Sequence, residues 1–87
     1  MAQVIENKKG FRVIEVALSD CIKWGGLGIC DWCNECIGST GYYVAVLNHV
    51  MCDKCYNDWC ERATYYPEDS RVEEKNFNYM KSVLNLQ

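Results

Sequence analysis

No stretch of this sequence is apolar over the length that a bilayer-spanning helix needs. The first ten residues, MAQVIENKKG, also lack the basic start, apolar core and small-residue cleavage site of a secretory signal peptide. Seven cysteines, an odd number, fit a reducing compartment better than a framework of disulfides. We therefore expect a cytoplasmic protein that does not associate with membranes.

Internal repeats and low-complexity tracts are also missing, so a single domain covering residues 1–87 is expected. A chain of 87 residues buries a modest core, which predicts an additional source of stability such as a bound metal. The only histidine is His49, and no set of nucleophile, base and acid can be assembled around it. We therefore do not expect an enzyme.

Basic residues are scarce where the cysteines are dense. Between Lys23 and Cys60 the only basic residues are Lys23 and Lys54. The same stretch contains four acidic residues, Asp31, Glu35, Asp53 and Asp58. Binding to nucleic acid depends on lysine and arginine side chains that displace counterions from phosphates, so this balance makes nucleic acid an unlikely partner.

Two Cys-x-x-Cys pairs are the strongest chemical signal in the chain. Cys30 and Cys33 form the first pair, Cys52 and Cys55 form the second, and eighteen residues separate them. A gap of two residues lets both thiolates of one tight turn reach the same ion, and two such turns supply the four sulfur ligands of tetrahedral zinc. The spacing predicts one Zn²⁺ ion in a four-cysteine site, and loss of this ion is expected to unfold the domain.

A shifted set of ligands remains an alternative. Cys33, Cys36, His49 and Cys52 would form a Cys₃His site with a Cys-x-x-Cys pair followed by His-x-x-Cys. Ile37 disfavours this set, because a β-branched residue stands where a turn at the metal favours glycine or asparagine.

Other metal arrangements also stay open. A second ion could use Cys36, His49 and Cys60, but spacing alone supplies no fourth ligand for it. Cys30, Cys33 and Cys36 have the spacing of the first three ligands of an iron–sulfur cluster, with Cys60 or Cys52 as a remote fourth. Iron could also occupy the four-cysteine site in place of zinc.

Patterns of apolar and turn residues predict two β-hairpins. Their strands are expected at residues 4–6, 11–18, 42–47 and 50–52. The second hairpin is expected to turn at Asn48 and His49, and residues 19–24 to form a short helical turn. Because neither side of the 11–18 strand is cleanly polar, we expect it to be covered on much of both faces.

Two helices are expected in the second half of the chain. Apolar residues at three- and four-residue steps, including Tyr56, Trp59 and Cys60, predict a helix from the second cysteine pair to about Thr64. Ser70 and Glu73 have the spacing of a capping box, which predicts that a C-terminal helix begins there and runs to about residue 86.

The order of a cysteine turn, a hairpin and a helix carrying the second cysteine pair resembles the treble-clef zinc finger, the family of GATA-type fingers and parts of LIM and RING modules. The resemblance covers residues 29–63, and Asn34 stands where that family places a residue tolerant of left-handed geometry. More loosely, the sequence is similar to small zinc-finger proteins of bacteria and phages. The resemblance implies a zinc finger at residues 29–64. Together with the strand and helix patterns, it predicts a small α+β fold with an N-terminal hairpin and short helical turn (1–28), the finger, and a C-terminal helix (65–87).

A structural zinc site leaves the function to the surface around it. Trp32 lies between two ligands of a tight turn and has little room to point inward, so we expect it to contact a protein partner together with Tyr42 or Tyr43. The predicted function is a protein–protein interaction module or adaptor. The alternatives are stacking of single-stranded nucleic acid on the same aromatic residues, or inhibition of a host enzyme by a phage or mobile element. The exposed edge of the first hairpin also makes a homodimer a candidate assembly.

Overall fold

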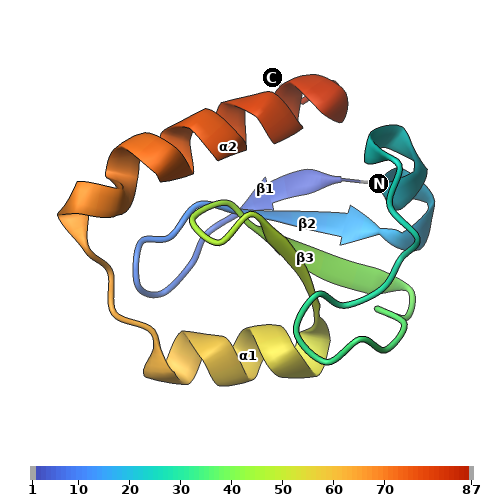
Figure 1. The fold of residues 1–87 in the computed structure, drawn as a ribbon, viewed down its shortest axis with the longest axis horizontal. Helices are drawn as coiled ribbons and strands as arrows, with labels where there is room; N and C mark the ends of the chain where they lie inside the picture. The colour runs from blue at the N-terminus through green and yellow to red at the C-terminus, as the bar shows by residue number, and fades with distance from the viewer. Residues whose placement is uncertain (1, 87) are drawn as a thin grey trace.

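The computed structural model describes residues 2–86 and has a four-stranded antiparallel sheet with helices on both sides (Figure 1). The strands follow one another in the sheet in the order of the chain, β1-β2-β3-β4. The elements are β1 (Gln3–Ile5), β2 (Val13–Ala17), the 3₁₀ helix η1 (Leu18–Trp24), β3 (Thr40–Val44), β4 (His49–Cys52), α1 (Asp53–Arg62), the 3₁₀ helix η2 (Pro67–Asp69) and α2 (Ser70–Val83). The expected small α+β fold with two hairpins and a C-terminal helix is confirmed.

Two neighbouring tyrosines show which helix covers which face of the sheet. Successive side chains of a strand point to opposite faces, so Tyr42 and Tyr43 on β3 lie on opposite faces of the sheet. Tyr42 stacks on Tyr56 of α1 with ring centroids 4.4 Å apart. The Tyr43 hydroxyl lies 3.5 Å from the backbone oxygen of Asn76 on α2. The sheet therefore lies between the two helices, as Figure 1 shows.

The central strand β2 owes its position to apolar side chains on both of its faces. Val13, Ile14 and Val16 are fully buried, and Ile14 pairs with Tyr43 on the adjacent β3. Burial on both faces was expected from the lack of a clean polar side, and α1 and α2 provide it. Among the described residues 2–86, no helix is long and apolar enough to cross a membrane.

The second hairpin turns earlier than the sequence suggested. β3 ends at Val44, and the turn comprises residues 45–48, with hydrogen bonds from the Leu47 N–H to the Val44 carbonyl and from the Asn48 N–H to the Ala45 carbonyl. Asn48 takes a φ of 55°, a left-handed conformation that asparagine tolerates. His49 is therefore the first residue of β4 and not a turn residue, which corrects the expected position of the turn.

The start of α2 also differs from the expectation. Residues Pro67–Asp69 form η2, which leads directly into α2, so Ser70 already has helical geometry, with φ of −60° and ψ of −33°. No side chain caps the helix, and the expected capping box does not form. The Glu73 carboxyl group instead points away from the helix end and accepts a hydrogen bond of 2.8 Å from the backbone N–H of Arg12.

Candidate metal centre

The first cysteine pair lies in a tight loop closed by backbone hydrogen bonds. The Cys30 N–H donates to the Glu35 carbonyl at 2.7 Å, and the Asn34 N–H donates to the Cys30 carbonyl at 2.9 Å. Asn34 has a φ of 66°, the left-handed geometry expected of it from the sequence. Ile29 and Cys36 form an isolated bridge at the base of the loop. We call residues 29–36 the knuckle.

A glycine of the sheet lets the chain that follows the knuckle approach β3 closely. Ile37 is buried, and its N–H donates to the Gly28 carbonyl at 2.9 Å. A Cβ atom on Gly41 would lie 2.9 Å from Ile37 Cδ1 and 3.2 Å from the Met51 carbonyl oxygen. Any side chain at position 41 would therefore push Ile37, and the knuckle with it, away from the sheet.

Asp31 fastens the knuckle to the outer edge of β4. Its backbone N–H donates to the Val50 carbonyl at 2.8 Å, and its carboxylate Oδ2 accepts from the Val50 N–H at 2.8 Å. Sequence reasoning counted Asp31 only as a negative charge and missed this role. The available signal was an aspartate directly after a ligand, since short acidic side chains often accept hydrogen bonds from nearby backbone in loops.

The second cysteine pair lies where β4 passes into α1. Cys52 ends the strand and is the N-cap of the helix, with φ of −71° and ψ of 166°, and Cys55 follows in the first turn. The free N–H groups and the dipole at a helix N-terminus favour negative charge, which would help to hold thiolates around a bound cation.

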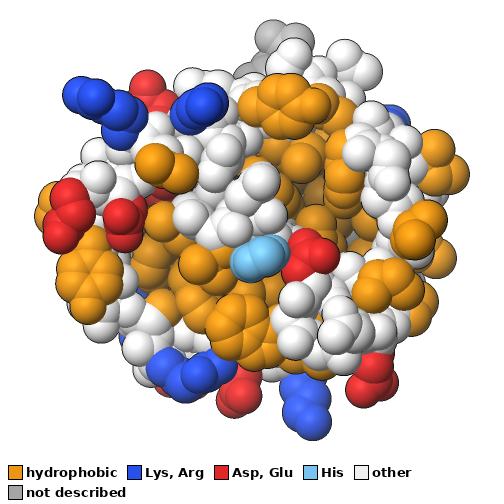
Figure 2. Space-filling view, in the orientation of Figure 1, with side chains coloured by type: hydrophobic (Ala, Val, Ile, Leu, Met, Phe, Trp, Pro, Cys, Tyr) orange, Lys and Arg blue, Asp and Glu red, His pale blue; other side chains and the backbone are white. Residues whose placement is uncertain are grey.

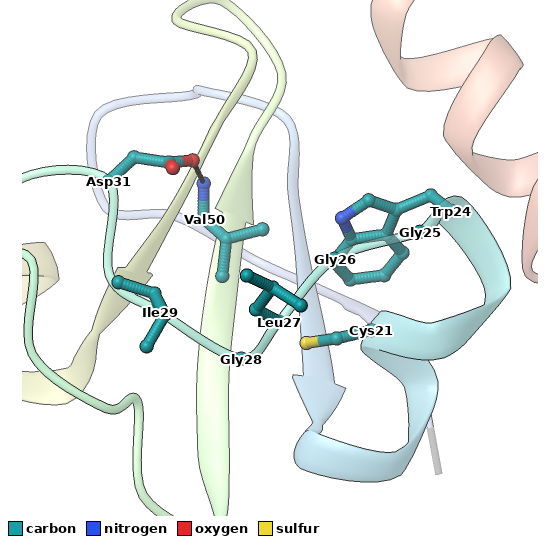
Figure 3. Close-up of a pocket in the computed structure, with 9 residues that line it drawn as sticks. All are labelled: Cys21, Trp24, Gly25, Gly26, Leu27, Gly28, Ile29, Asp31 and Val50. Atoms are coloured by element: carbon teal, nitrogen blue, oxygen red, sulfur yellow. Dashed lines mark hydrogen bonds between the residues drawn. The ribbon is translucent and has the colours of Figure 1, made fainter.

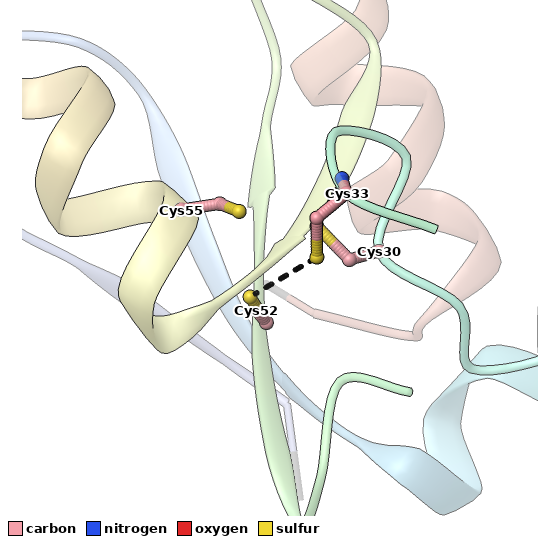
Figure 4. Close-up of side chains that lie close together, drawn as sticks. All are labelled: Cys30, Cys33, Cys52 and Cys55. Atoms are coloured by element: carbon pink, nitrogen blue, oxygen red, sulfur yellow. Dashed lines mark hydrogen bonds between the residues drawn. The ribbon is translucent and has the colours of Figure 1, made fainter. Parts of the chain in front are cut away.

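The four cysteines of the two pairs meet at one point of the structure. The sulfur atoms of Cys30, Cys33, Cys52 and Cys55 all lie within 4.8 Å of one another, and Figure 4 shows the sulfurs converging from the knuckle, β4 and α1. The Sγ atoms of Cys33 and Cys52 are 3.9 Å apart. Four sulfurs at about 2.3 Å from a tetrahedral zinc ion would be about 3.8 Å from one another. The donor set and its spacing therefore fit one tetrahedral metal ion.

The thiols perturb one another strongly. Burial works to raise the pKa of Cys30, but N–H groups of Cys33, Cys52 and Trp32 outweigh it and lower this pKa to about 7. Burial and hydrogen bonds with the other three cluster thiols raise the pKa of Cys55 to about 12. The protein alone thus stabilises one thiolate at the expense of a neighbour, and four thiolates at this spacing require a cation among them.

The other candidate ligands lie outside this cluster. Cys36 Sγ is at the surface and accepts from the Gly38 N–H at 3.4 Å. His49 Nδ1 lies 3.6 Å from Asp31 Oδ2, and buried Cys60 accepts from Asn7 Nδ2 at 3.3 Å. Within residues 2–86 the structure brings together no second group of ligands and not the shifted set of Cys33, Cys36, His49 and Cys52.

The three aromatic residues expected to contact a partner differ in exposure. Trp32 is 47% exposed, and the Arg62 guanidinium lies 5.6 Å from its ring centroid. Tyr42 is half-buried against Tyr56 of α1. Tyr43 is only 1% exposed and belongs to the core, which corrects the expectation that it faces a partner. Of the three, Trp32 presents the most accessible ring.

The sulfur donors of the four-cysteine cluster and their spacing are the features that indicate a metal site. No family model, curated protein sequence or solved structure matches this chain.

Proposed function

We propose that the four-cysteine cluster holds a structural Zn²⁺ ion. The observation that carries this proposal is the convergence of four sulfurs from two distant chain segments within 4.8 Å. Zinc favours four thiolates in tetrahedral geometry, and four protein ligands leave no open position for a reactive water. When bound, the ion would join the knuckle, β4 and α1, and its role would be to stabilise the fold and not to catalyse a reaction.

We also propose that residues 29–63 form a treble-clef finger. The succession of knuckle, β3–β4 hairpin and α1, with one ligand pair on the knuckle and one at the start of α1, supports this assignment. The basic residues of α1 are Lys54 and Arg62, so the base-reading function of some treble-clef fingers does not carry over to this chain.

The function that we propose is a protein–protein interaction module presented on this finger. Trp32 is an exposed aromatic residue held on a loop that the metal would make rigid, and exposed tryptophans often contribute much of the energy of protein interfaces. A rigid anchor of this kind loses little conformational entropy on binding.

The metal proposal is tested by exchanging single cysteines. Purified Cys55→Ser should lose bound zinc, with affinity reduced more than about 100-fold, because loss of an outer-shell partner alone typically costs 10- to 100-fold. Cys36→Ser is the matched control, since Cys36 lies on the knuckle outside the cluster, and should retain one zinc per chain. Elemental analysis and native mass spectrometry give the ion and its stoichiometry. Loss of zinc in Cys36→Ser but not in Cys55→Ser would refute the four-cysteine assignment.

The interaction proposal is tested on the zinc-loaded protein. Trp32→Ala should lose a partner that the wild type captures from the cells in which the protein occurs, whereas Tyr66→Ala, which alters another exposed aromatic residue, should retain it. A partner captured equally by Trp32→Ala would show that Trp32 is not the binding site.

Single-stranded nucleic acid is the second candidate, and the pairing of Arg62 with the exposed Trp32 ring is the observation that favours it. Labelled oligonucleotides should then bind the wild type at low ionic strength, and binding should weaken with salt and disappear in Trp32→Ala. Absence of binding at low ionic strength would exclude this function.

A further inference from the structure

The sheet face that α2 covers is left partly open beside η1. Two adjoining cavities of about 340 and 290 Å³ lie there, and they share the side chains of Trp24, Asp31 and Val50. Figure 2 shows a hollow lined by hydrophobic side chains beside the single histidine, His49, which itself lies next to Asp31. We call the two cavities together the α2-side groove; their size suits one side chain or a short segment of chain.

The α2-side groove combines exposed apolar side chains with polar ones, among them Asp31 and Asn48. Leu27, which lines one cavity, is 86% exposed, and Tyr79, which lines the other, is 64% exposed. Val50 is buried and is shared by both cavities. A partner that removes these apolar side chains from water would be stabilised by their burial. Apolar residues gathered around a hollow therefore indicate a binding surface, whereas single exposed apolar residues are common on any protein.

Two polar atoms in the groove, one oxygen of Asp31 and the indole nitrogen of Trp24, make no hydrogen bond within residues 2–86. Asp31 uses Oδ2 for the Val50 N–H and the approach of His49, while Oδ1 makes no hydrogen bond. Trp24 Nε1–H also donates to no group of the protein in this part of the chain. Figure 3 shows the Trp24 ring and the Asp31 carboxylate at opposite ends of the larger cavity. The groove thus offers one hydrogen-bond donor and one charged acceptor, separated by apolar surface.

The charge near this acceptor is predominantly negative. Asp31 directly follows Cys30, and four thiolates around Zn²⁺ would add two negative charges next to it. Within residues 2–86, His49 is the only basic side chain that pairs with Asp31, and Lys23 instead approaches Asp20 at 3.7 Å. A positive charge on a bound molecule would therefore meet little competition at Asp31.

We propose that the α2-side groove binds a partner peptide in which an apolar side chain stands beside a lysine or arginine. The apolar side chain fills the groove over Val50, the cation pairs with Asp31, and a peptide carbonyl accepts from Trp24 Nε1–H. A peptide supplies all three features at once, which an apolar small molecule does not. This inference rests on the proposed interaction function, but it names a surface separate from Trp32.

The experiment begins with an unbiased selection on the zinc-loaded protein. A random heptapeptide display library is the probe, and selected peptides should place an apolar residue within two positions of lysine or arginine. Leu27→Ser should weaken their binding about tenfold, whereas Ile22→Ser should not, because Ile22 is another highly exposed apolar residue that does not line the groove. No enrichment, or equal loss in both variants, would overturn the proposal.

The charge requirement is tested with a selected peptide and its Lys/Arg→Gln counterpart. The basic peptide should bind the wild type about fivefold more tightly, and Asp31→Asn should remove this difference, whereas Glu35→Gln should preserve it. Asp31 also holds the knuckle to β4, so Asp31→Asn could lose zinc. In that case the comparison of the basic peptide with its Gln counterpart on the wild-type protein decides the question. Equal affinity of the two peptides for the wild type would overturn the pairing with Asp31.

The site is located by NMR with the same peptide. The indole N–H resonance of Trp24, assigned through Trp24→Phe, should shift on addition of peptide, and that of Trp32 should not. Three results would overturn the proposed peptide as the occupant of the groove. A shift confined to Trp32 would place the peptide elsewhere, a concentration-dependent dimer without peptide would indicate a second copy of the chain, and tighter binding by an apolar small molecule would indicate a small-molecule site. Zinc content and capture through Trp32 are measured separately, so failure here leaves the proposed function to its own tests.

Discussion

At the scale of single residues, the two adjacent tyrosines of β3 have opposite roles because a strand alternates its faces. Tyr42 stacks on α1 near the metal cluster, whereas Tyr43 is enclosed between the sheet and α2. The Tyr43 hydroxyl donates to Asn48 Oδ1 at 2.7 Å, which satisfies its one polar group inside the core. Burial and, to a smaller extent, the neighbouring Tyr79 raise the pKa of Tyr43 to about 12.

This pKa predicts alkaline instability with a defined origin. Because the folded pKa is raised from 10.0 to about 12, the stability linked to neutral Tyr43 is fully present below pH 10. It is lost as the pH rises from 10 to 12, and two pKa units correspond to about 3 kcal/mol of unfolding free energy. Urea unfolding of the zinc-loaded protein at pH 9 and pH 11.5, compared with Tyr43→Phe, measures this loss.

Tyr43→Phe should remove the part of the alkaline decline that Tyr43 causes, and the part from Tyr56, whose pKa burial also raises to about 12, should remain. Tyr66→Phe, at an exposed tyrosine, should leave the decline as in the wild type. A parallel decline in Tyr43→Phe and wild type would show that other groups cause it.

The residue roles that the sequence predicted are those that depend on a few neighbouring residues in the chain. Cysteine spacing predicted the four cysteines whose sulfurs cluster in the structure, and the need for a positive φ identified Asn34, because both depend on a few consecutive residues. The burial of Tyr43 could not be read in this way. In the run from Tyr42 to Leu47 every side chain is apolar or aromatic, so no alternation shows which tyrosine faces the core.

At the scale of elements, the loop between β1 and β2 connects the sheet to both helices. Asn7 Nδ2 donates to the Tyr56 hydroxyl at 2.9 Å, and Lys9 Nζ donates to the Ala63 carbonyl at the end of α1 at 2.6 Å. On the other side, the Arg12 N–H donates to Glu73 of α2. The sequence predicted only a simple turn for this loop, because contacts between residues 49 to 61 positions apart leave no local pattern.

Glu73 shows the same limit. Its spacing from Ser70 suggested a local cap, but Pro67 starts a 3₁₀ turn that carries Ser70 into the helix. Glu73 is instead 1% exposed, with one carboxyl oxygen 2.8 Å from the Arg12 N–H and the other 3.4 Å from the Tyr65 hydroxyl. The Glu73 side chain thus binds a distant segment of the chain and does not cap its own helix.

Removal of the Glu73 carboxyl group should therefore loosen α2. Glu73→Ala leaves the Arg12 N–H without its acceptor, and an unsatisfied buried donor costs about 1–3 kcal/mol. Glu74→Ala is the matched control, because Glu74 is 62% exposed and its ion pair with Arg12 is 3.8 Å long. This control should change stability by less than about 1 kcal/mol. Chemical denaturation followed by tryptophan fluorescence compares the two variants, and an equal effect would contradict the proposed role of Glu73.

At the scale of the whole molecule, the four-cysteine cluster brings together the knuckle, β4 and α1. The knuckle meets the sheet through the Asp31–Val50 pair and buried Ile37, and α1 follows β4 directly through Cys52. The buried apolar core includes residues of β2, β3, β4 and both α-helices, and Cys30 is a fully buried residue of the knuckle. A bound ion would supply the cross-link between these parts that a short chain lacks.

Removal of the metal should consequently unfold most of the molecule. Structural zinc contributes apparent binding free energy on the order of 10 kcal/mol, and small domains are stable by about 5–15 kcal/mol in total. Titration with a strong zinc chelator should therefore release one ion per chain together with loss of helical circular dichroism, and added Zn²⁺ should restore both. Cys36→Ser should behave as the wild type, since its sulfur lies outside the cluster. If the chelated protein loses its ion but keeps its circular dichroism and urea midpoint, the apolar core alone sustains the fold, because no other cross-link would remain to hold the knuckle, β4 and α1 together.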